Sequence, residues 1–251
     1  MPRLDQLLVT LGLARSRTRA QRLIRNGKVA LAESGRLLTK PGEKLAETTV
    51  LAVGEDPEER YVSRGGLKLE AVLETLGLSL ENVTVLDVGQ STGGFTDCAL
   101  AYGARHVVGV EVGHGQLDAS LRQDPRVNCL EGINARHMSQ SEEVLAALAA
   151  YPATTAVMDV SFISQTLIVP EIAALLPAGG QLISLVKPQF ELGPDAVDAR
   201  GVVRDPGRYT DVEARIRQCC DTHGFSVEHW QESPITGGDG NREFLLLGRR
   251  R

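Results

Sequence analysis

From residue 83 onward, short apolar runs alternate with longer amphipathic segments. The runs occupy residues 83–89, 106–113, 127–132, 154–162, 180–190 and 243–249. The segments at 96–104, 115–124, 141–151 and 165–176 fit helical periodicity, and a further helix is predicted near 208–223. Nearly continuous apolar strands separated by helices are typical of a buried parallel sheet with helices on both faces. The pattern therefore predicts an α/β, Rossmann-like sheet.

Residues 1–53 follow a different pattern. Apolar residues at 4, 7, 8 and 11 predict one helix, and Ser16 is the predicted N-cap of a second helix that Gly27 ends. Short β-like runs with turn signals follow over 28–53. We therefore predict a small α+β domain over 1–53. An acidic, proline-containing stretch at 54–62 is predicted to be a solvated linker to a second domain over 63–251.

Charge is divided unevenly between these two parts. Residues 1–53 hold ten Lys and Arg against four Asp and Glu, whereas residues 54–251 hold 17 against 28. Residues 6–32 contain no Asp or Glu, so Arg19, Arg22 and Arg25 recur along the second helix without acidic residues between them. A solvated helix surface is the simple explanation. Unpaired arginines on a short helix also suit contact with phosphate, which favours a polyanion-binding module.

Composition limits the remaining classes of protein. No apolar stretch is long enough to span a membrane, and the N-terminus lacks the apolar core of a secretory signal, so we expect a cytoplasmic protein that does not bind membranes. The four cysteines form no C-x-x-C pair and the five histidines are scattered. We therefore expect reduced thiols and no metal site.

Polar residues follow most of the predicted strands. In parallel α/β sheets ligands bind at the carboxyl ends of the strands. The final strand differs because its acidic residue lies at its start, which reaches the same rim if that strand runs antiparallel at the sheet's edge. Any one such residue is more often a cap than a functional group, but six at one rim indicate a site. The six are Asp87, Glu111, Asn134, Asp159, Lys187 and Glu243.

The loop "LDVGQSTGGFTDC" (86–98) follows the first of these strands. No lysine follows Gly94, which argues against a P-loop, and the glycine spacing does not match the G-x-G-x-x-G dinucleotide fingerprint. A tight strand-to-helix turn is the simple explanation of the glycines. Asp87 beside an ammonium and Glu111 on a ribose would instead suit S-adenosylmethionine (SAM).

Two lysines and two acids favour a hydroxyl as the methyl acceptor. Residues 159–162 read "DVSF", without the prolines of many base N-methyltransferases and without a nucleophilic cysteine. A ribose 2'-OH needs a base, and a lysine made neutral by burial or by a neighbouring cation can serve. Lys68 falls in the first turn of an amphipathic helix predicted over 63–76, beside its apolar stripe.

Several stretches resemble known families. Residues 1–53 resemble the S4 RNA-binding domain, and Lys68, Asp159, Lys187 and Glu243 match the K-D-K-E set of FtsJ-type ribose 2'-O-methyltransferases. The stretches "RYVSRGGLKLEAVL", "DVGQSTGGFTDCAL", "DVSFIS", "LVKPQFE" and "SPITGGDGNREFLL" resemble the TlyA or hemolysin-A-like family, which joins the two domains.

The resemblance implies a SAM-dependent methyltransferase that acts on ribosomal RNA or ribosomal subunits, at a cytidine ribose. It implies that Lys187 is the leading base candidate, supported by Asp159, Lys68 and Glu243. The implied RNA-binding residues are Arg3, Arg15, Arg17, Arg19, Arg22 and Lys28. The implied SAM-site residues are Asp87, Gly89, Ser91, Thr92, Gly93, Gly94, Glu111 and Asn134. Phe162 and Phe190 pack either on a nucleoside or in the core.

Two departures from the family pattern stand out. Gln90 occupies a loop position where a small residue is expected, and we predict that its side chain contacts the methionine end of SAM. Residues 195–206 hold one glycine where the family has a more glycine-rich lid, which bears on the mobility of that loop.

Two other functions compete with the methyltransferase. The first is a non-catalytic RNA-binding or ribosome-assembly factor that retains SAM binding, although all four positions of the K-D-K-E set are filled. The second is a membrane-lytic protein, as the family's older name suggests, although no spanning or lytic helix is evident.

Overall fold

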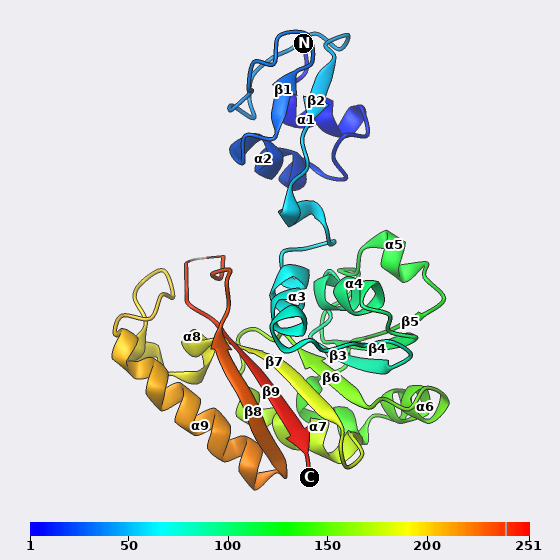
Figure 1. Ribbon diagram of the computed structural model, residues 1–251, viewed down its shortest axis with the longest axis vertical. Coiled ribbons are helices and arrows are strands. Elements are labelled where there is room, and N and C mark those ends of the chain that lie inside the picture. The colour runs from blue at the N-terminus through cyan, green and yellow to red at the C-terminus, as the bar shows by residue number, and fades with distance from the viewer. Residues whose placement is uncertain (239) are drawn as a thin grey trace. The chain divides into compact units, whose positions relative to one another are not determined.

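The computed structural model describes residues 1–238 and 240–251, together with all of their side chains except that of residue 58. Residue 239, in the motif at 233–246, lies outside the described residues. The chain forms two compact units, Met1–Arg60 and Tyr61–Arg251 (Figure 1).

The first unit is a small α+β fold. Its elements are α1 (Leu4–Thr10), α2 (Arg17–Arg25), β1 (Val29–Leu31), β2 (Leu51–Val53) and the 3-10 helix η1 (Pro57–Glu59). The predicted N-cap is confirmed, because the Ser16 side chain accepts a hydrogen bond from the Arg19 N–H. Leu4, Leu8 and Ile24 are fully buried between the two helices and the antiparallel β1–β2 pair.

The stretch predicted as a linker, 54–62, is divided between the two units. Residues up to Arg60 belong to the first unit, whereas Tyr61 begins the second. Ion pairs from α2 to Glu59 and a hydrogen bond from Asn26 to Asp56 hold residues 56–59 against the first unit. This part of the stretch is therefore packed, because its acidic side chains find basic and amide partners on α2.

The second unit contains one seven-stranded sheet, and the α/β prediction is confirmed. The strands are β3 (Thr84–Val88), β4 (His106–Glu111), β5 (Val127–Glu131), β6 (Thr155–Met158), β7 (Gln181–Val186), β8 (Phe225–Glu232) and β9 (Phe244–Arg250), in the order β5-β4-β3-β6-β7-β9-β8. The first five in that order pair in parallel, whereas β9 pairs antiparallel with both β7 and β8.

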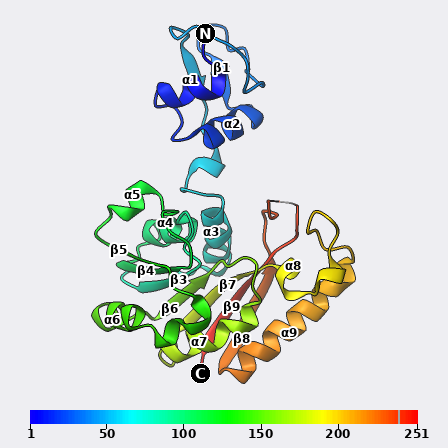
Figure 2. The same ribbon diagram turned by 180° about the vertical axis from the view of Figure 1, so that it is seen from behind.

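Helices cover both faces of this sheet (Figure 2). They are α3 (Gly65–Leu76), α4 (Gly94–Ala101), α5 (Ala119–Arg122), α6 (Glu142–Ala150), α7 (Val169–Leu175), α8 (Pro188–Glu191) and α9 (Tyr209–Thr222). Neighbouring strand residues alternate between two cores. Ile183 belongs to the core that includes α3 and α4, whereas Leu182 belongs to the core that includes α6, α7 and α9.

Two expectations about these elements were wrong. The final strand, β9, does not lie at the sheet's edge; β8 pairs along its outer side and takes the edge position. The helix predicted over 115–124 is reduced to the short α5, because Gly115 has a φ of 67° and Asp118 caps the helix by accepting a hydrogen bond from the Ser120 N–H. β9 nevertheless starts at the rim where β7 ends, since Val186 pairs with Phe244.

Candidate active site

The candidate catalytic residues meet at the carboxyl rim of the sheet. Asp159 follows β6 and Lys187 follows β7, while Glu243 directly precedes the antiparallel β9. Lys68 comes from α3 and is buried there. The chain reversal between β8 and β9 therefore brings an acid from the end of the sequence to the rim of the parallel strands.

Lys187 and Asp159 form one ion pair of this site. The Lys187 Nζ lies 2.6 Å from Asp159 Oδ1 and donates a hydrogen bond of 2.9 Å to the Ser161 Oγ. Lys187 is the N-cap residue of α8, and Pro188 begins that helix. This turn fixes the backbone where the lysine side chain leaves the sheet.

Lys68 and Glu243 form a second, more deeply buried pair. The Lys68 ammonium donates to Glu243 Oε2, and the exposed fractions of the two side chains are 10% and 3%. The start of α3 also adjoins the first pair, since a Cβ at Gly65 would lie 3.6 Å from Asp159 Oδ2. All four predicted catalytic residues therefore lie around the start of α3, and each lysine has its own carboxylate.

A cavity of about 610 Å³ opens beside Asp159. Its lining comes from the ends of β3, β4, β5 and β6 and the loops that follow them. The lining residues are Gly89, Ser91, Val110, Glu111, Val112, Gln116, Ile133, Asn134, Ala135, Arg136, Asp159, Val160, Ser161, Phe162, Ile163 and Ile168. Such a mixed lining, apolar with a few charged and amide groups, is typical of a small-molecule site.

Four of the predicted SAM-site residues line this cavity: Gly89, Ser91, Glu111 and Asn134. Glu111 is buried, and its carboxylate accepts hydrogen bonds from the Ser91 N–H at 2.9 Å and the Gly113 N–H at 2.8 Å. Gly89 has a φ of 82°, and a Cβ there would come within 2.6 Å of the Asp159 carbonyl oxygen. Only glycine fits this close approach of the loop to β6.

Gln90 is also a predicted SAM-site residue, but its side chain does not line the cavity in this structure. Gln90 is buried, packs where a side chain at Gly109 would otherwise lie, and donates a 2.9 Å hydrogen bond to the Thr96 Oγ1. Gly109 on β4 leaves the space that this glutamine fills. The long Gln90 side chain therefore packs inside the protein and supports the loop.

Asp87 is also fully buried and does not line the cavity. Its Oδ2 accepts a 2.6 Å hydrogen bond from the Thr96 hydroxyl, while its Oδ1 has no partner among the described residues. Burial raises the pKa of Asp87 to about 7 against the lowering effect of Thr96, and the charges of Asp159 and Glu111 raise it further.

The other three predicted loop residues do not line the cavity. Thr92 is exposed, and its carbonyl accepts from the Asp118 N–H. Gly93 has a φ of 94° and leaves room for leucines of the following segment, while Gly94 leaves room for Ser63 and the start of α3. These glycines serve helix packing in this structure.

Sequence reasoning missed several lining residues, above all Arg136 and Gln116. Gln116 lies in the loop after β4 and Arg136 lies in the 3-10 helix Ala135–Gln140 that follows β5, where the rule that ligands bind at strand ends gave the only signal.

Phe162 stands out beside Asp159. It lines the cavity, is 91% exposed, and has a φ of 64°, a conformation that strains a bulky residue. Its ring lies 5.0 Å from that of Phe190, which follows Lys187 by three residues. An exposed aromatic ring in a strained backbone is therefore presented at the edge of the site.

The segment 195–206 is anchored near the start of β9. Val197 and Val203 form an isolated β-bridge, and Asn241, which contacts this segment, is buried. The Asn241 side chain donates to the Gly201 carbonyl at 2.9 Å and accepts from the Val203 N–H at 3.1 Å. The two hydrogen bonds of the Asn241 side chain therefore hold the conformation of the segment 195–206.

Most predicted RNA-binding residues of the first unit have intramolecular partners. Arg3 and Arg17 pair with the buried Asp5, where the Arg3 guanidinium holds the pKa of the carboxyl well below its usual range. The prediction of arginines without acidic partners on α2 is wrong for Arg19 and Arg22, because both pair with Glu59 from beyond the second strand.

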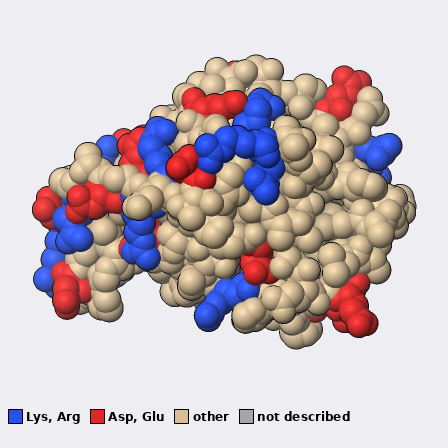
Figure 3. All heavy atoms as spheres, turned by 90° about the horizontal axis from the view of Figure 1, so that it is seen from below, with Lys and Arg blue, Asp and Glu red and all other residues tan. Residues whose placement is uncertain are grey.

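Arg15 and Lys28, the remaining predicted RNA-binding residues, are exposed and half-buried respectively. On the face of the molecule drawn in Figure 3, lysine and arginine side chains lie next to acidic ones. Within residues 1–238 and 240–251, no helix has the length and hydropathy needed to cross a membrane. The same residues contain no cluster of three or more His, Cys, Asp or Glu placed to hold a metal ion.

Known proteins match both units. A family model described as "FtsJ-like methyltransferase" matches residues 61–250, and one described as "S4 domain" matches residues 2–50. The chain is 45% identical over 244 residues to "Putative rRNA methyltransferase YqxC" of Bacillus subtilis, covering 97% of this chain and 84% of that protein.

Two further proteins match over nearly the whole chain. "16S/23S rRNA (cytidine-2'-O)-methyltransferase TlyA" of Mycobacterium tuberculosis is 40% identical over 247 residues, covering 97% of this chain and 88% of that protein. The solved structure titled "Putative hemolysin from Streptococcus thermophilus" superposes with a TM-score of 0.75 at 41% identity, covering 99% of this chain and 88% of that one. The chain therefore belongs to the FtsJ-like methyltransferase family and carries an S4 domain at its N-terminus.

Proposed function

We propose that this protein is a SAM-dependent methyltransferase that modifies a ribose 2'-OH, with cytidine as the nucleoside, in ribosomal RNA. The observation that carries the proposal is the pair of lysine–carboxylate contacts at the carboxyl rim of the sheet, Lys187–Asp159 and Lys68–Glu243. The mycobacterial relative, named a cytidine-2'-O-methyltransferase, supports this choice of acceptor.

The cavity fits SAM. Glu111 reaches it from the end of β4, where an acid accepts hydrogen bonds from ribose hydroxyls. Behind the loop, Asp87 has a buried oxygen without a partner among the described residues, and burial raises its pKa to about 7. A cation such as the ammonium of the methionine part would stabilise the charged form of this carboxyl group. When bound, SAM supplies an electrophilic methyl group on a sulfonium.

Lys187 is the proposed base. Its Nζ is held by Asp159 and Ser161 at the edge of the cavity, so that a hydroxyl placed there would meet a positioned nitrogen. To accept the 2'-OH proton the lysine must first lose one of its own, and the Asp159 carboxylate at 2.6 Å is the nearest acceptor. Proton transfer by a positioned group of this kind contributes about 10²- to 10⁴-fold to a rate.

Lys68 and Glu243 play a supporting role in this proposal. Their pair is buried and fixes α3 against β9, which positions the start of α3 beside Asp159. Phe162 and Phe190 are placed to pack on the target nucleoside, since an exposed aromatic face stacks on a base without regard to its hydrogen-bonding edge.

The S4 unit is the proposed RNA-docking module. Its basic composition favours the phosphate backbone of folded RNA, and the cytoplasm, where ribosomes work, is the proposed location.

The test is transfer of tritiated methyl groups from SAM to purified ribosomal subunits, followed by mapping of 2'-O-methyl positions. We expect label in rRNA at a cytidine ribose. Binding of SAM and RNA without any transfer would contradict the proposal and favour the non-catalytic factor. Dye leakage from liposomes caused by the protein alone would instead support a membrane-lytic activity.

A further inference from the structure

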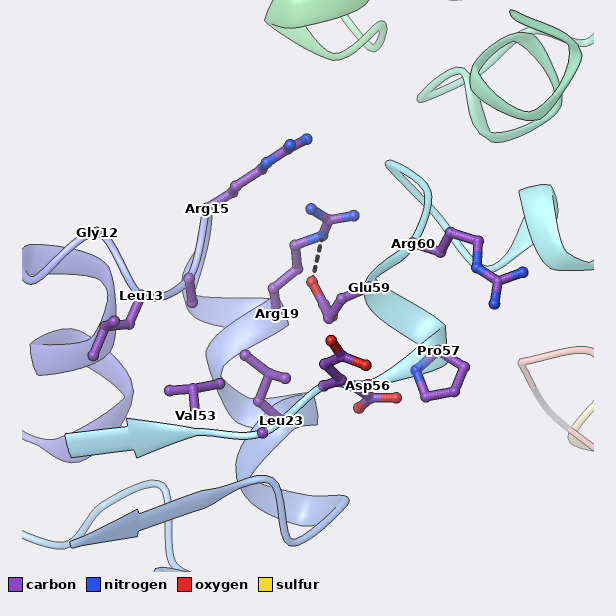
Figure 4. A pocket seen from close by; sticks show the side chains of 13 residues that line it. Gly12, Leu13, Arg15, Arg19, Leu23, Val53, Asp56, Pro57, Glu59 and Arg60 are labelled. Carbon is purple, nitrogen blue, oxygen red and sulfur yellow. Dashed lines mark ion pairs between the residues drawn. The ribbon is translucent and has the colours of Figure 1, made fainter. Parts of the chain in front are cut away.

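The acidic side chain of Glu59 occupies the arginine face of α2. Its Oε1 accepts a 3.0 Å hydrogen bond from Arg22 Nε and is also paired with Arg22 Nη2, while its Oε2 lies 3.2 Å from Arg19 Nε. Each carboxylate oxygen is therefore bound by a different arginine (Figure 4 shows the Arg19 contact).

This contact is more sheltered than an ordinary surface ion pair. The exposed fractions of the side chains are 10% for Arg19, 21% for Arg22 and 20% for Glu59. Two guanidinium groups three residues apart on one helix repel each other, and they need an anion when they are this poorly solvated.

Glu59 belongs to a segment that packs along α2. Asp56 accepts a 2.8 Å hydrogen bond from the Asn26 side chain, and the Gly54 N–H donates to the Lys28 carbonyl at 2.7 Å. Beside Glu59 lies a cavity of about 510 Å³, whose lining includes the exposed Arg15. There is room at this point for a larger anion than a carboxylate.

We propose that Arg19 and Arg22 form a phosphate-binding subsite for RNA and that the Glu59 carboxylate fills it in the RNA-free protein. Arginine binds carboxylate and phosphate oxygens through the same planar fork, so one group replaces the other without a change of donors. RNA must displace Glu59 to reach the two arginines, and the acid therefore weakens binding of polyanions that cannot do so. The inference rests on the proposed function, since it names how the RNA-docking unit is regulated.

The test compares Glu59→Gln with Glu55→Gln in the full-length chain. Both variants remove one negative charge from the same segment, but the exposed Glu55 makes no ion pair with α2 among the described residues. The probe is a fluorescently labelled, structured RNA hairpin, measured over a range of salt concentrations. Glu59→Gln should bind about 3- to 10-fold more tightly than Glu55→Gln, with a slope of log affinity against log salt that is steeper by about one ion.

A second measurement, of thermal stability in the presence of phosphate, keeps the inference testable if the Glu59→Gln variant folds poorly. Millimolar inorganic phosphate should raise the melting temperature of Glu59→Gln more than that of the wild type, because the ion takes the place of the missing Glu59 carboxylate on the two arginines. Glu59→Asp, which keeps the charge but has a shorter reach, should fall between the two.

Equal RNA affinity of the two glutamine variants, or equal phosphate stabilisation of Glu59→Gln and wild type, would overturn the inference while leaving the proposed function intact. A wild-type protein that binds no RNA and methylates no ribosomal subunit would remove both.

Discussion

Lys68 and Glu243 lie 175 residues apart in the sequence and form a buried ion pair at the rim of the sheet. Glu243 reaches that rim because β9 runs antiparallel to β7 and begins where β7 ends. The pair joins the first helix of the methyltransferase unit to its last strand, so it connects the two ends of this unit.

Removal of one member of this pair should destabilise the fold. Glu243→Gln leaves the Lys68 charge buried without its carboxylate, and we expect a loss of roughly 3 kcal/mol in the free energy of unfolding, measured with urea. The double variant Lys68→Met/Glu243→Leu should lose less than Glu243→Gln alone, because no charge is left unpaired. Strictly additive losses in this double-mutant cycle would contradict the pair's importance.

Lys187→Ala should abolish most methyl transfer while leaving the fold intact. We expect a loss of about 10²- to 10⁴-fold in the rate, since the proposed base is removed from the edge of the cavity. Lys187→Arg is the matched control, because it keeps the positive charge but cannot act as a base near neutral pH. Substantial activity of either variant in the tritium assay would contradict the proposed role of Lys187 as the base.

Phe162→Ala should lower activity without loss of stability. The ring is 91% exposed, so its removal sacrifices little buried surface, and alanine relieves part of the strain at a φ of 64°. We expect about a 10- to 100-fold drop in kcat/KM for ribosomal subunits, from the loss of base stacking worth about 1–3 kcal/mol. SAM affinity by calorimetry should stay within about threefold, which is under 1 kcal/mol; a larger change would place the ring on the cofactor instead.

Gln90→Ala should act on stability rather than by direct loss of a ligand contact. Its side chain fills the space beside Gly109 and bonds Thr96, so truncation leaves a cavity and removes a buried hydrogen bond, at a cost of about 1–3 kcal/mol. Glu111→Ala is the contrasting variant, since it removes a cavity-lining carboxylate and should weaken SAM binding at least about tenfold, or 1.4 kcal/mol. Loss of SAM binding in Gln90→Ala at unchanged stability would return Gln90 to the cofactor site.

Asp87 predicts a specific dependence of stability on pH. Its pKa is raised from 3.8 to about 7 in the folded chain, mainly by burial, so between these values the native state keeps a proton that the unfolded state releases. Stability from this group is therefore greatest below about pH 4, falls as the pH rises to about 7, and is constant above that. This fall in the free energy of unfolding amounts to a few kcal/mol, and Asp87→Asn should not show it when urea unfolding is measured across the pH range. Identical pH profiles for the two proteins would refute the raised pKa.

The same carboxyl group should make SAM affinity depend on pH. Binding of an ammonium beside Asp87 favours the ionised carboxylate, so we expect affinity to weaken as the pH falls below about 7, with proton release on binding. Calorimetry in buffers of different ionisation enthalpy measures that release.

The sequence by itself determined the class of fold and the residues that meet at the candidate site. Apolar runs separated by amphipathic helices allow a buried parallel sheet, and polar residues after such runs must collect at one rim, because parallel strands all end there. Lys187, Asp159 and Glu111 were found in this way, since their positions follow from strand ends alone. Glu243 was also placed correctly at the rim, although the sequence pattern did not predict that β8, and not β9, takes the edge of the sheet.

The tertiary structure decided which loop residues face the cavity and which arginines have partners. A loop of five or six residues gives no periodicity, so the burial of Gln90 depends on the absence of a side chain at Gly109, on another strand. The partner of Arg19 and Arg22 is likewise Glu59, which follows them by 40 and 37 residues and meets them only after the chain has formed β1 and β2. Local pattern fixes which groups a segment carries, whereas contacts between distant segments fix which of them remain available to a ligand.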